Sequence, residues 1–128
     1  MAEKKKKILL IDDEEAFGQA VKMNLENTGS YEVRYEKFGL KALDVALEFV
    51  PDLILLDFMM RDLGGTAVAE KLHSNSQLKD VPIVFLSAAA PTKSNDRRES
   101  TMGGFPSISK PIETDHLIMC IERHLSKK

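Results

Sequence analysis

Several features are scarce in this chain of 128 residues, and each scarcity excludes a class of protein. The only cysteine, Cys120, has no partner for an internal disulfide, which is usual in a reducing cytosol. No apolar run approaches the roughly 20 residues that a membrane-spanning helix needs. The lysine-rich start, Met1 to Lys7, precedes an apolar run only as long as a strand, so it does not resemble a signal peptide. We therefore expect a cytoplasmic protein without membrane insertion.

A large excess of charge of either sign is also lacking. The formal net charge is -2, which argues against direct nucleic-acid binding as the main role of the chain. A hydrophobic content of 43% and a charged content of 30% are typical of a globular protein. At this length we expect a single domain over residues 1–128, with its core at about 7–125.

Short apolar runs separated by helix-length segments dominate the rest of the sequence. They predict buried strands of a parallel sheet at Lys6 to Ile11, Leu53 to Leu56, Ile83 to Leu86 and Ser107 to Ser109, with a less buried strand at Tyr31 to Tyr35. Helices should occupy the intervening segments and the C-terminus: Glu14 to Thr28, Gly39 to Val50, Thr66 to His73, a stretch within Ala88 to Met102, and Thr114 to Leu125. Five strands and five helices favour an α/β fold, a doubly wound flavodoxin-like parallel sheet of order 2-1-3-4-5.

Two of the expected helices differ in how well their apolar residues anchor them. Leu43, Leu47 and Val50 should face inward from the second helix, which Pro51 ends. The segment Ala88 to Met102 is polar and has no large apolar residue before Met102, so the fourth helix should be short, shallowly packed or mobile.

Four of the predicted strands are followed by polar residues that suit a phosphoryl group and a metal. Asp12 and Asp13 follow the first strand, Asp57 the third, Ser87 the fourth and Lys110 the fifth. Since the carboxyl ends of parallel strands share one edge of the sheet, these side chains should form one pocket. The second strand lies at the sheet edge in this order, away from the crevice, and has no such group at its end.

Each of these residues has an ordinary interpretation when taken alone. Asp12 or Asp13 could cap a helix, Asp57 could be a loop acid, Ser87 a turn residue and Lys110 a solvated lysine. The adjacent carboxylates, however, repel each other in a shared site unless a cation is present, which favours a metal. The combination, in this order and each at a strand end, argues for a joint function.

In this arrangement the chain resembles the receiver domains of response regulators, from about Lys7 to Leu125. The resemblance implies that Asp57 accepts a phosphoryl group from a histidine kinase or a histidine phosphotransfer protein, with Ser87 and Lys110 contacting the phosphoryl oxygens. It also implies a downstream output domain or protein as partner. Such a domain is no conventional enzyme, although it promotes its own phosphorylation and dephosphorylation.

The same resemblance implies a Mg²⁺ cofactor, which Mn²⁺ could replace. Its ligands would be Asp13, Asp57 and the backbone carbonyl of Met59, with Asp12 acting mostly through water. Phosphorylation would then change the surface around the fourth helix and the fifth strand.

Two residues depart from the pattern of the family. Arg61 occupies the place of a usual proline, so the loop after Asp57 should be less rigid and more polar. Ser107 occupies the place of a usual aromatic switch residue, and Phe105 lies two residues earlier on the same side of the strand, at a different depth.

Three other functions compete with the phosphoacceptor. A degenerate receiver could act as a phosphorylation-independent interaction module, but such a module does not need all five polar residues. An aspartate-nucleophile phosphatase would carry its nucleophile on the first strand and need room for a cap. A flavin phosphate would want a Ser/Thr/Gly-rich loop after the first strand, where this chain has Asp12-Asp13-Glu14-Glu15.

Overall fold

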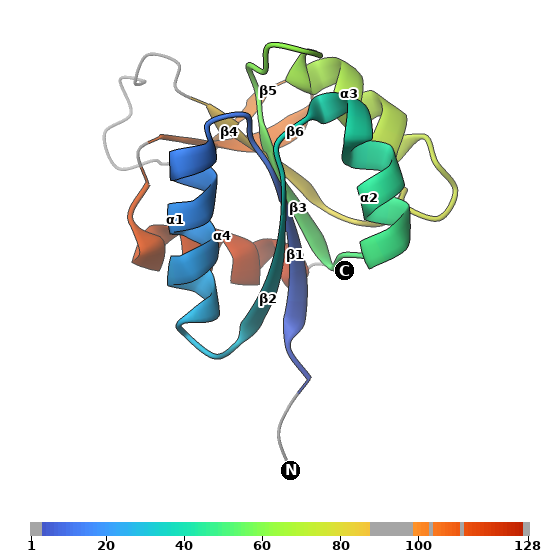
Figure 1. Ribbon diagram of the computed structural model, residues 1–128. Coiled ribbons are helices and arrows are strands. Elements are labelled where there is room, and N and C mark those ends of the chain that lie inside the picture. Colours follow the sequence, from blue (N-terminus) through green and yellow to red (C-terminus); the bar gives the residue numbers. More distant parts are fainter. Residues whose placement is uncertain (1–3, 88–98, 103, 111, 127–128) are drawn as a thin grey trace.

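A parallel sheet with helices on both faces forms the framework of the protein (Figure 1). The computed structural model describes residues 4–87, 99–102, 104–110 and 112–126. Its parallel strands are β1 (Lys6–Ile11), β2 (Tyr31–Glu36), β3 (Leu53–Asp57), β4 (Ile83–Ser87) and β6 (Phe105–Ser109). The order β2-β1-β3-β4-β6 confirms the flavodoxin-like order expected from the sequence.

A sixth strand extends the sheet beyond its parallel part. Strand β5 (Glu99–Met102) pairs antiparallel with β6, and the chain turns back at Gly104, whose φ of +87° favours glycine. The end of the segment in which we expected the fourth helix is therefore a strand, and residues 88–98 lie outside the described part.

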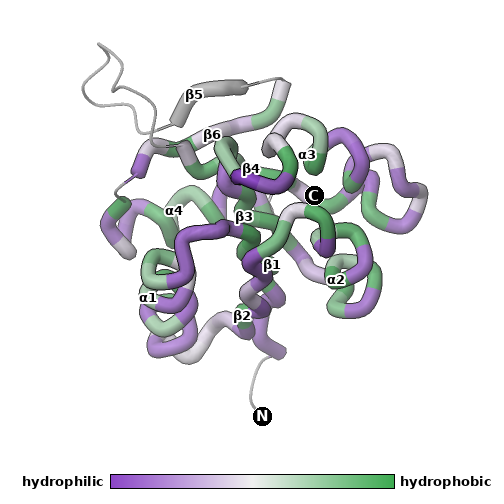
Figure 2. The backbone as a smooth tube through the Cα atoms, turned by 45° about the horizontal axis from the view of Figure 1, so that its top comes forward, coloured by the Kyte–Doolittle hydropathy of each residue, from purple (hydrophilic) through white to green (hydrophobic). Residues whose placement is uncertain are grey.

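Two helices cover each face of the sheet in the described part of the chain. Helices α1 (Glu15–Glu26) and α4 (Thr114–Leu125) lie on one face, while α2 (Ala42–Phe49) and α3 (Gly65–His73) lie on the other, with a short 3₁₀ turn, η1 (Gly39–Lys41), before α2. Figure 2 shows hydrophobic residues on the central strand β3, between helices that alternate polar and apolar residues. None of the helices in the described ranges is long and apolar enough to cross a bilayer.

Strand β3 is shared between the two halves of the hydrophobic core. Leu53 and Leu55 pack with α1 and α4, whereas Ile54 and Leu56 pack with α2 and α3, and all four are fully buried. This division follows from the alternation of side chains along a strand that is covered on both faces. Asp57, which continues the strand, is therefore carried on a segment that is packed from both sides.

The end of helix α2 differs from the expectation. Leu43 and Leu47 pack against the core as expected, but Val50 is 60% exposed and has a φ of 53°. Pro51 disfavours the helical conformation at the residue before it, so the helix ends at Phe49 and Val50 leaves its inward face.

Candidate functional site

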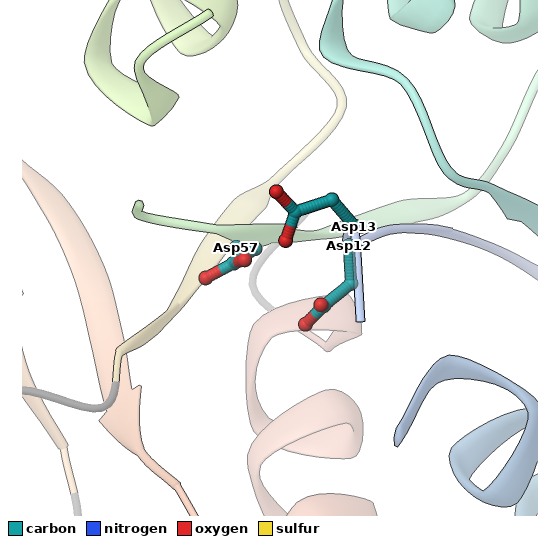
Figure 3. A group of neighbouring side chains, drawn as sticks. All are labelled: Asp12, Asp13 and Asp57. Carbon is teal, nitrogen blue, oxygen red and sulfur yellow. The ribbon is translucent and has the colours of Figure 1, made fainter. Parts of the chain in front are cut away.

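The polar residues at the strand ends do gather at one edge of the sheet. Asp12 follows β1 directly, Asp57 ends β3, Ser87 ends β4 and Lys110 follows β6. Asp12, Asp13 and Asp57 each offer one carboxylate oxygen, and these oxygens all lie within 4.8 Å of one another. Figure 3 shows the three side chains grouped at the ends of their strands. The strand-end rule thus placed these residues correctly.

The surroundings of Asp57 raise the pKa of its carboxyl group. It is only 4% exposed, and burial, followed by the charge of Asp12, raises its pKa to about 6. The Lys110 ammonium, 3.5 Å from Asp57 Oδ1, and the Met59 N–H, which donates to the same oxygen at 3.3 Å, oppose this rise. At neutral pH the carboxylate is thus mainly ionised and can act as a nucleophile.

Asp12 is fully buried, and each of its carboxylate oxygens has one polar contact. Oδ1 accepts from the Glu14 N–H at 2.8 Å. Oδ2 forms an ion pair with Lys110, whose Nζ lies 2.9 Å away. A buried carboxylate oxygen of this kind, next to two other carboxylates, is suited to a hard divalent cation.

Lys110 connects the acids at the sheet edge. Burial lowers the pKa of Lys110, but its contacts with Asp12, Asp57 and Glu14 outweigh burial and raise it. Its ammonium also lies 4.4 Å from the ring centroid of Phe17, a cation–π contact. The side chain is only 9% exposed, so its charge acts where water screens little.

Asp13 is held from the loop that follows β3. The backbone N–H of Arg61 donates to Asp13 Oδ2 at 2.9 Å. A proline at position 61 would have no N–H to donate. Arg61, at the place of the family's usual proline, therefore supplies a hydrogen bond to Asp13. This effect is more specific than the less rigid loop expected from the sequence.

Ser87 and Ser107 are both buried on neighbouring strands. The Ser87 carbonyl accepts from the Lys110 N–H at 2.8 Å, which fixes these two residues relative to each other. Phe105 packs edge-to-face against Phe85, at 5.7 Å between ring centroids, and against His73, at 5.6 Å. The half-buried ring of Phe105 thus packs against the core, in contact with β4 and α3.

Two neighbours of the site were missed by sequence reasoning. Glu14 lies 3.1 Å from Lys110 Nζ, and Tyr35, near the end of β2, donates its hydroxyl to the Asp12 carbonyl oxygen at 2.5 Å. The expectation that β2 lies away from the crevice is wrong for Tyr35, because a tyrosine side chain is long enough to reach the next strand. Gly18, a glycine within helix α1, is the feature of the sequence that could have indicated this contact, because it makes room for the Tyr35 ring.

Comparison with known proteins identifies this arrangement. The family model of the response regulator receiver domain matches residues 8–122. The chain belongs to this family. Receiver domains are signalling domains that interact with histidine kinases and downstream effectors.

Individual relatives match this receiver domain over most of its length. The polar-differentiation response regulator DivK of Brucella ovis is 32% identical over 120 residues, which are 94% of this chain and 96% of DivK. The DNA-binding dual master transcriptional regulator RpaA of Synechocystis is 30% identical over 117 residues, which are 88% of this chain. That match covers 46% of RpaA, so the receiver domain spans about half the length of that relative.

Solved structures agree with the fold of the receiver domain. The chemotaxis protein CheY4 of Vibrio cholerae superimposes with a TM-score of 0.79 at 26% identity, over 94% of this chain and 98% of CheY4. A CheY-like receiver domain protein of Methanospirillum hungatei gives a TM-score of 0.80 at 25% identity, over 97% of this chain and 96% of that one.

Proposed function

We propose that this receiver domain is the phosphoacceptor of a two-component system and that Asp57 is the residue phosphorylated. The observation that carries the proposal is the position of the Asp57 carboxylate, which is buried at a strand end with Lys110 and the acid pair around it. A phosphohistidine of a histidine kinase or a histidine phosphotransfer protein is the phosphodonor. An output domain or protein responds to the phosphorylated form.

The transfer itself needs few groups from the receiver. A carboxylate oxygen of Asp57 attacks phosphorus, the P–N bond to the donor histidine breaks, and the leaving imidazole keeps the electron pair and takes a proton from solvent. Lys110 pairs with one phosphoryl oxygen, and the Ser87 hydroxyl donates to another. Because this transition state spreads charge over the equatorial oxygens, a fixed ammonium and hydroxyl lower the barrier by electrostatic stabilisation.

The acid cluster suits Mg²⁺, or Mn²⁺ in its place. Asp13, Asp57 and the Met59 carbonyl would hold the ion directly, and Asp12 would act mostly through water. When bound, the ion supplies positive charge next to the phosphoryl oxygens. The fit rests on the chemistry of the donor set: three carboxylates offer oxygens within 4.8 Å of one another and would repel one another without a cation.

The response to phosphorylation is proposed at the side of the sheet beyond β4. Movement of the Ser87 hydroxyl toward the phosphoryl group would change the surface around the end of β4 and around β6. Since Ser107 has no ring and Phe105 is packed against Phe85, the change need not involve an aromatic rotamer. We place this signalling in the cytoplasm.

Intact-mass analysis tests the phosphoacceptor directly. With Mg²⁺ and a small phosphodonor, the wild-type protein should gain one phosphoryl group, and Asp57→Asn should gain none. Asp44→Asn, which removes an exposed acid of α2, is the matched control and should be phosphorylated normally. A phosphoryl group on Asp57→Asn would assign the acceptor elsewhere. No gain in the wild type, with a histidine phosphotransfer donor as well, would favour the interaction module.

The hydrogen bond from Arg61 to Asp13 gives a second prediction. Arg61→Pro removes the donor N–H, whereas Arg61→Ala removes the side chain and keeps the N–H. Because hydrogen bonds from outside the ligand shell orient a metal ligand, Arg61→Pro should weaken Mg²⁺ binding by about tenfold. Calorimetric titration measures this, and Arg61→Ala should bind like the wild type. Equal weakening in both variants would assign the effect to the arginine side chain.

A further inference from the structure

Strand β2 holds the backbone of Asp12 at two points. The Asp12 N–H donates to the Glu36 carbonyl at 3.1 Å, and the Asp12 carbonyl accepts from the Tyr35 hydroxyl at 2.5 Å. The first bond continues the ladder between β1 and β2. The second is made by a side chain, and it holds the peptide group that joins Asp12 to Asp13. The orientation of this peptide group sets the direction in which Asp13 leaves the chain.

The Tyr35 ring is seated against helix α1 at Gly18. A Cβ atom added to Gly18 would lie 2.2 Å from Tyr35 Cε1, so no larger residue fits there without moving the ring. Glycine in a helix interior is usually unfavourable relative to alanine. Here it lets the ring approach the helix backbone closely enough for the hydroxyl to reach the end of β1. The aromatic side chain therefore has little freedom to point elsewhere.

We propose that Tyr35 is a positioning residue for the cation site, because it fixes the turn that carries Asp12 and Asp13. This inference rests on the proposed Mg²⁺ site. The carboxylates of Asp12, Asp13 and Asp57 repel one another without a cation, so a turn that is free to relax moves them apart. The Tyr35 hydroxyl opposes this relaxation through the backbone, whereas the Arg61 N–H holds the Asp13 side chain. A site held in place before the ion arrives binds it more tightly.

The chain contains its own control for this inference. Tyr31 lies on the same strand and also donates a side-chain hydrogen bond, but to the Glu122 carboxylate on α4. Tyr31→Phe and Tyr35→Phe each remove one oxygen atom from β2, and only Tyr35→Phe removes a contact with the acid pair. Neither change leaves a cavity larger than a hydroxyl group, so both variants should fold.

Calorimetric titration with Mg²⁺ alone tests the positioning role. Tyr35→Phe should bind Mg²⁺ about tenfold more weakly than the wild type, the usual size of the loss when an orienting hydrogen bond near a metal is removed. Tyr31→Phe should bind like the wild type. Unchanged affinity in Tyr35→Phe overturns the inference, and so does an equal loss in both variants, which would indicate a general effect of β2. A wild type that does not bind Mg²⁺ overturns the metal site itself.

Tyrosine emission tests whether the ion binds beside Tyr35. The chain has no tryptophan and only two tyrosines, so each Phe variant leaves one emitting residue. Mg²⁺ should change the emission of Tyr31→Phe, in which Tyr35 remains beside the site, and leave that of Tyr35→Phe unchanged. The opposite pattern would place the response at Tyr31 and overturn the inference.

Gly18→Ala tests the same contact from the helix. The added methyl group displaces the Tyr35 ring and should weaken Mg²⁺ binding in the same direction as Tyr35→Phe. In a Tyr35→Ala background there is no ring to displace, so the further loss from Gly18→Ala should vanish. An undiminished loss in that background would show that Gly18 acts independently of Tyr35 and would overturn this part of the argument.

Discussion

Asp57→Asn should stabilise the metal-free protein near neutral pH, although it removes the proposed phosphoacceptor. Burial, followed by the charge of Asp12, raises the pKa of Asp57 to about 6, so the folded protein holds this carboxylate ionised at a cost. The rise from an ordinary value of 3.8 corresponds to at most about 3 kcal/mol. Asparagine avoids this cost and keeps the shape of the side chain.

The gain should depend on pH in a defined direction. A carboxyl group whose pKa is raised on folding stabilises the folded state when it is protonated. This contribution to stability is fully present below the unfolded pKa of about 4 and is lost as the pH rises through the folded pKa of about 6. Because asparagine does not titrate, the advantage of Asp57→Asn should be largest above this window and disappear below it.

Urea denaturation in the presence of a chelator, over a pH series, measures the difference between the two proteins. Asp44→Asn, with the same change in charge at an exposed position on α2, should show no such gain. An advantage of Asp57→Asn that is undiminished at the acid end would mean that the cost of burying the charge is not its source.

Asp13→Asn should lower the affinity for Mg²⁺ by at least about tenfold, as loss of a charged ligand does. The Asp13 carboxylate is one of three that approach within 4.8 Å, and it faces water more than Asp12 or Asp57 does. It can therefore take an ion directly with little rearrangement. Calorimetric titration of the wild type and the variant gives the change.

Asp62→Asn is the matched control for this prediction. Asp62 lies in the loop that carries Arg61, and its carboxylate accepts the N–H groups of Gly39 and Leu40 at 3.2 and 3.0 Å. Asparagine removes the same charge and keeps an acceptor oxygen. An equal loss of affinity in both variants would mean that the acids attract the ion only through their overall negative charge. Normal binding by Asp13→Asn would mean that the ion binds elsewhere.

The sheet and the acid cluster were predictable because both follow from simple rules. Uniformly apolar runs such as Leu53 to Leu56 indicate strands that are buried on both faces. The ends of parallel strands meet at one edge, so Asp12, Asp57 and Lys110 had to converge once the strands were assigned. Neither step depends on the details of side-chain packing.

The remainder depends on such details and was not predictable. The reach of the Tyr35 hydroxyl depends on the close approach of its ring to Gly18, and strand order alone places β2 away from the site. Val50 was predicted to lie on the inward face of α2. Because Pro51 follows it, the helix ends at Phe49, one residue before Val50. Strand β5 pairs with β6 across a turn at Gly104. The sequence of β5 has no alternation of apolar and polar residues from which this strand could have been predicted.

Strand β3 has a consequence for how sequences of this kind can diverge. Its residues Leu53 to Leu56 are divided between the two halves of the core, so a shift of Asp57 along the sheet would require both halves to repack together. Substitutions on the outer surfaces of α1 or α3 carry no such requirement. Lineages of such a chain can therefore change their helix surfaces one residue at a time, while Asp57 stays in place.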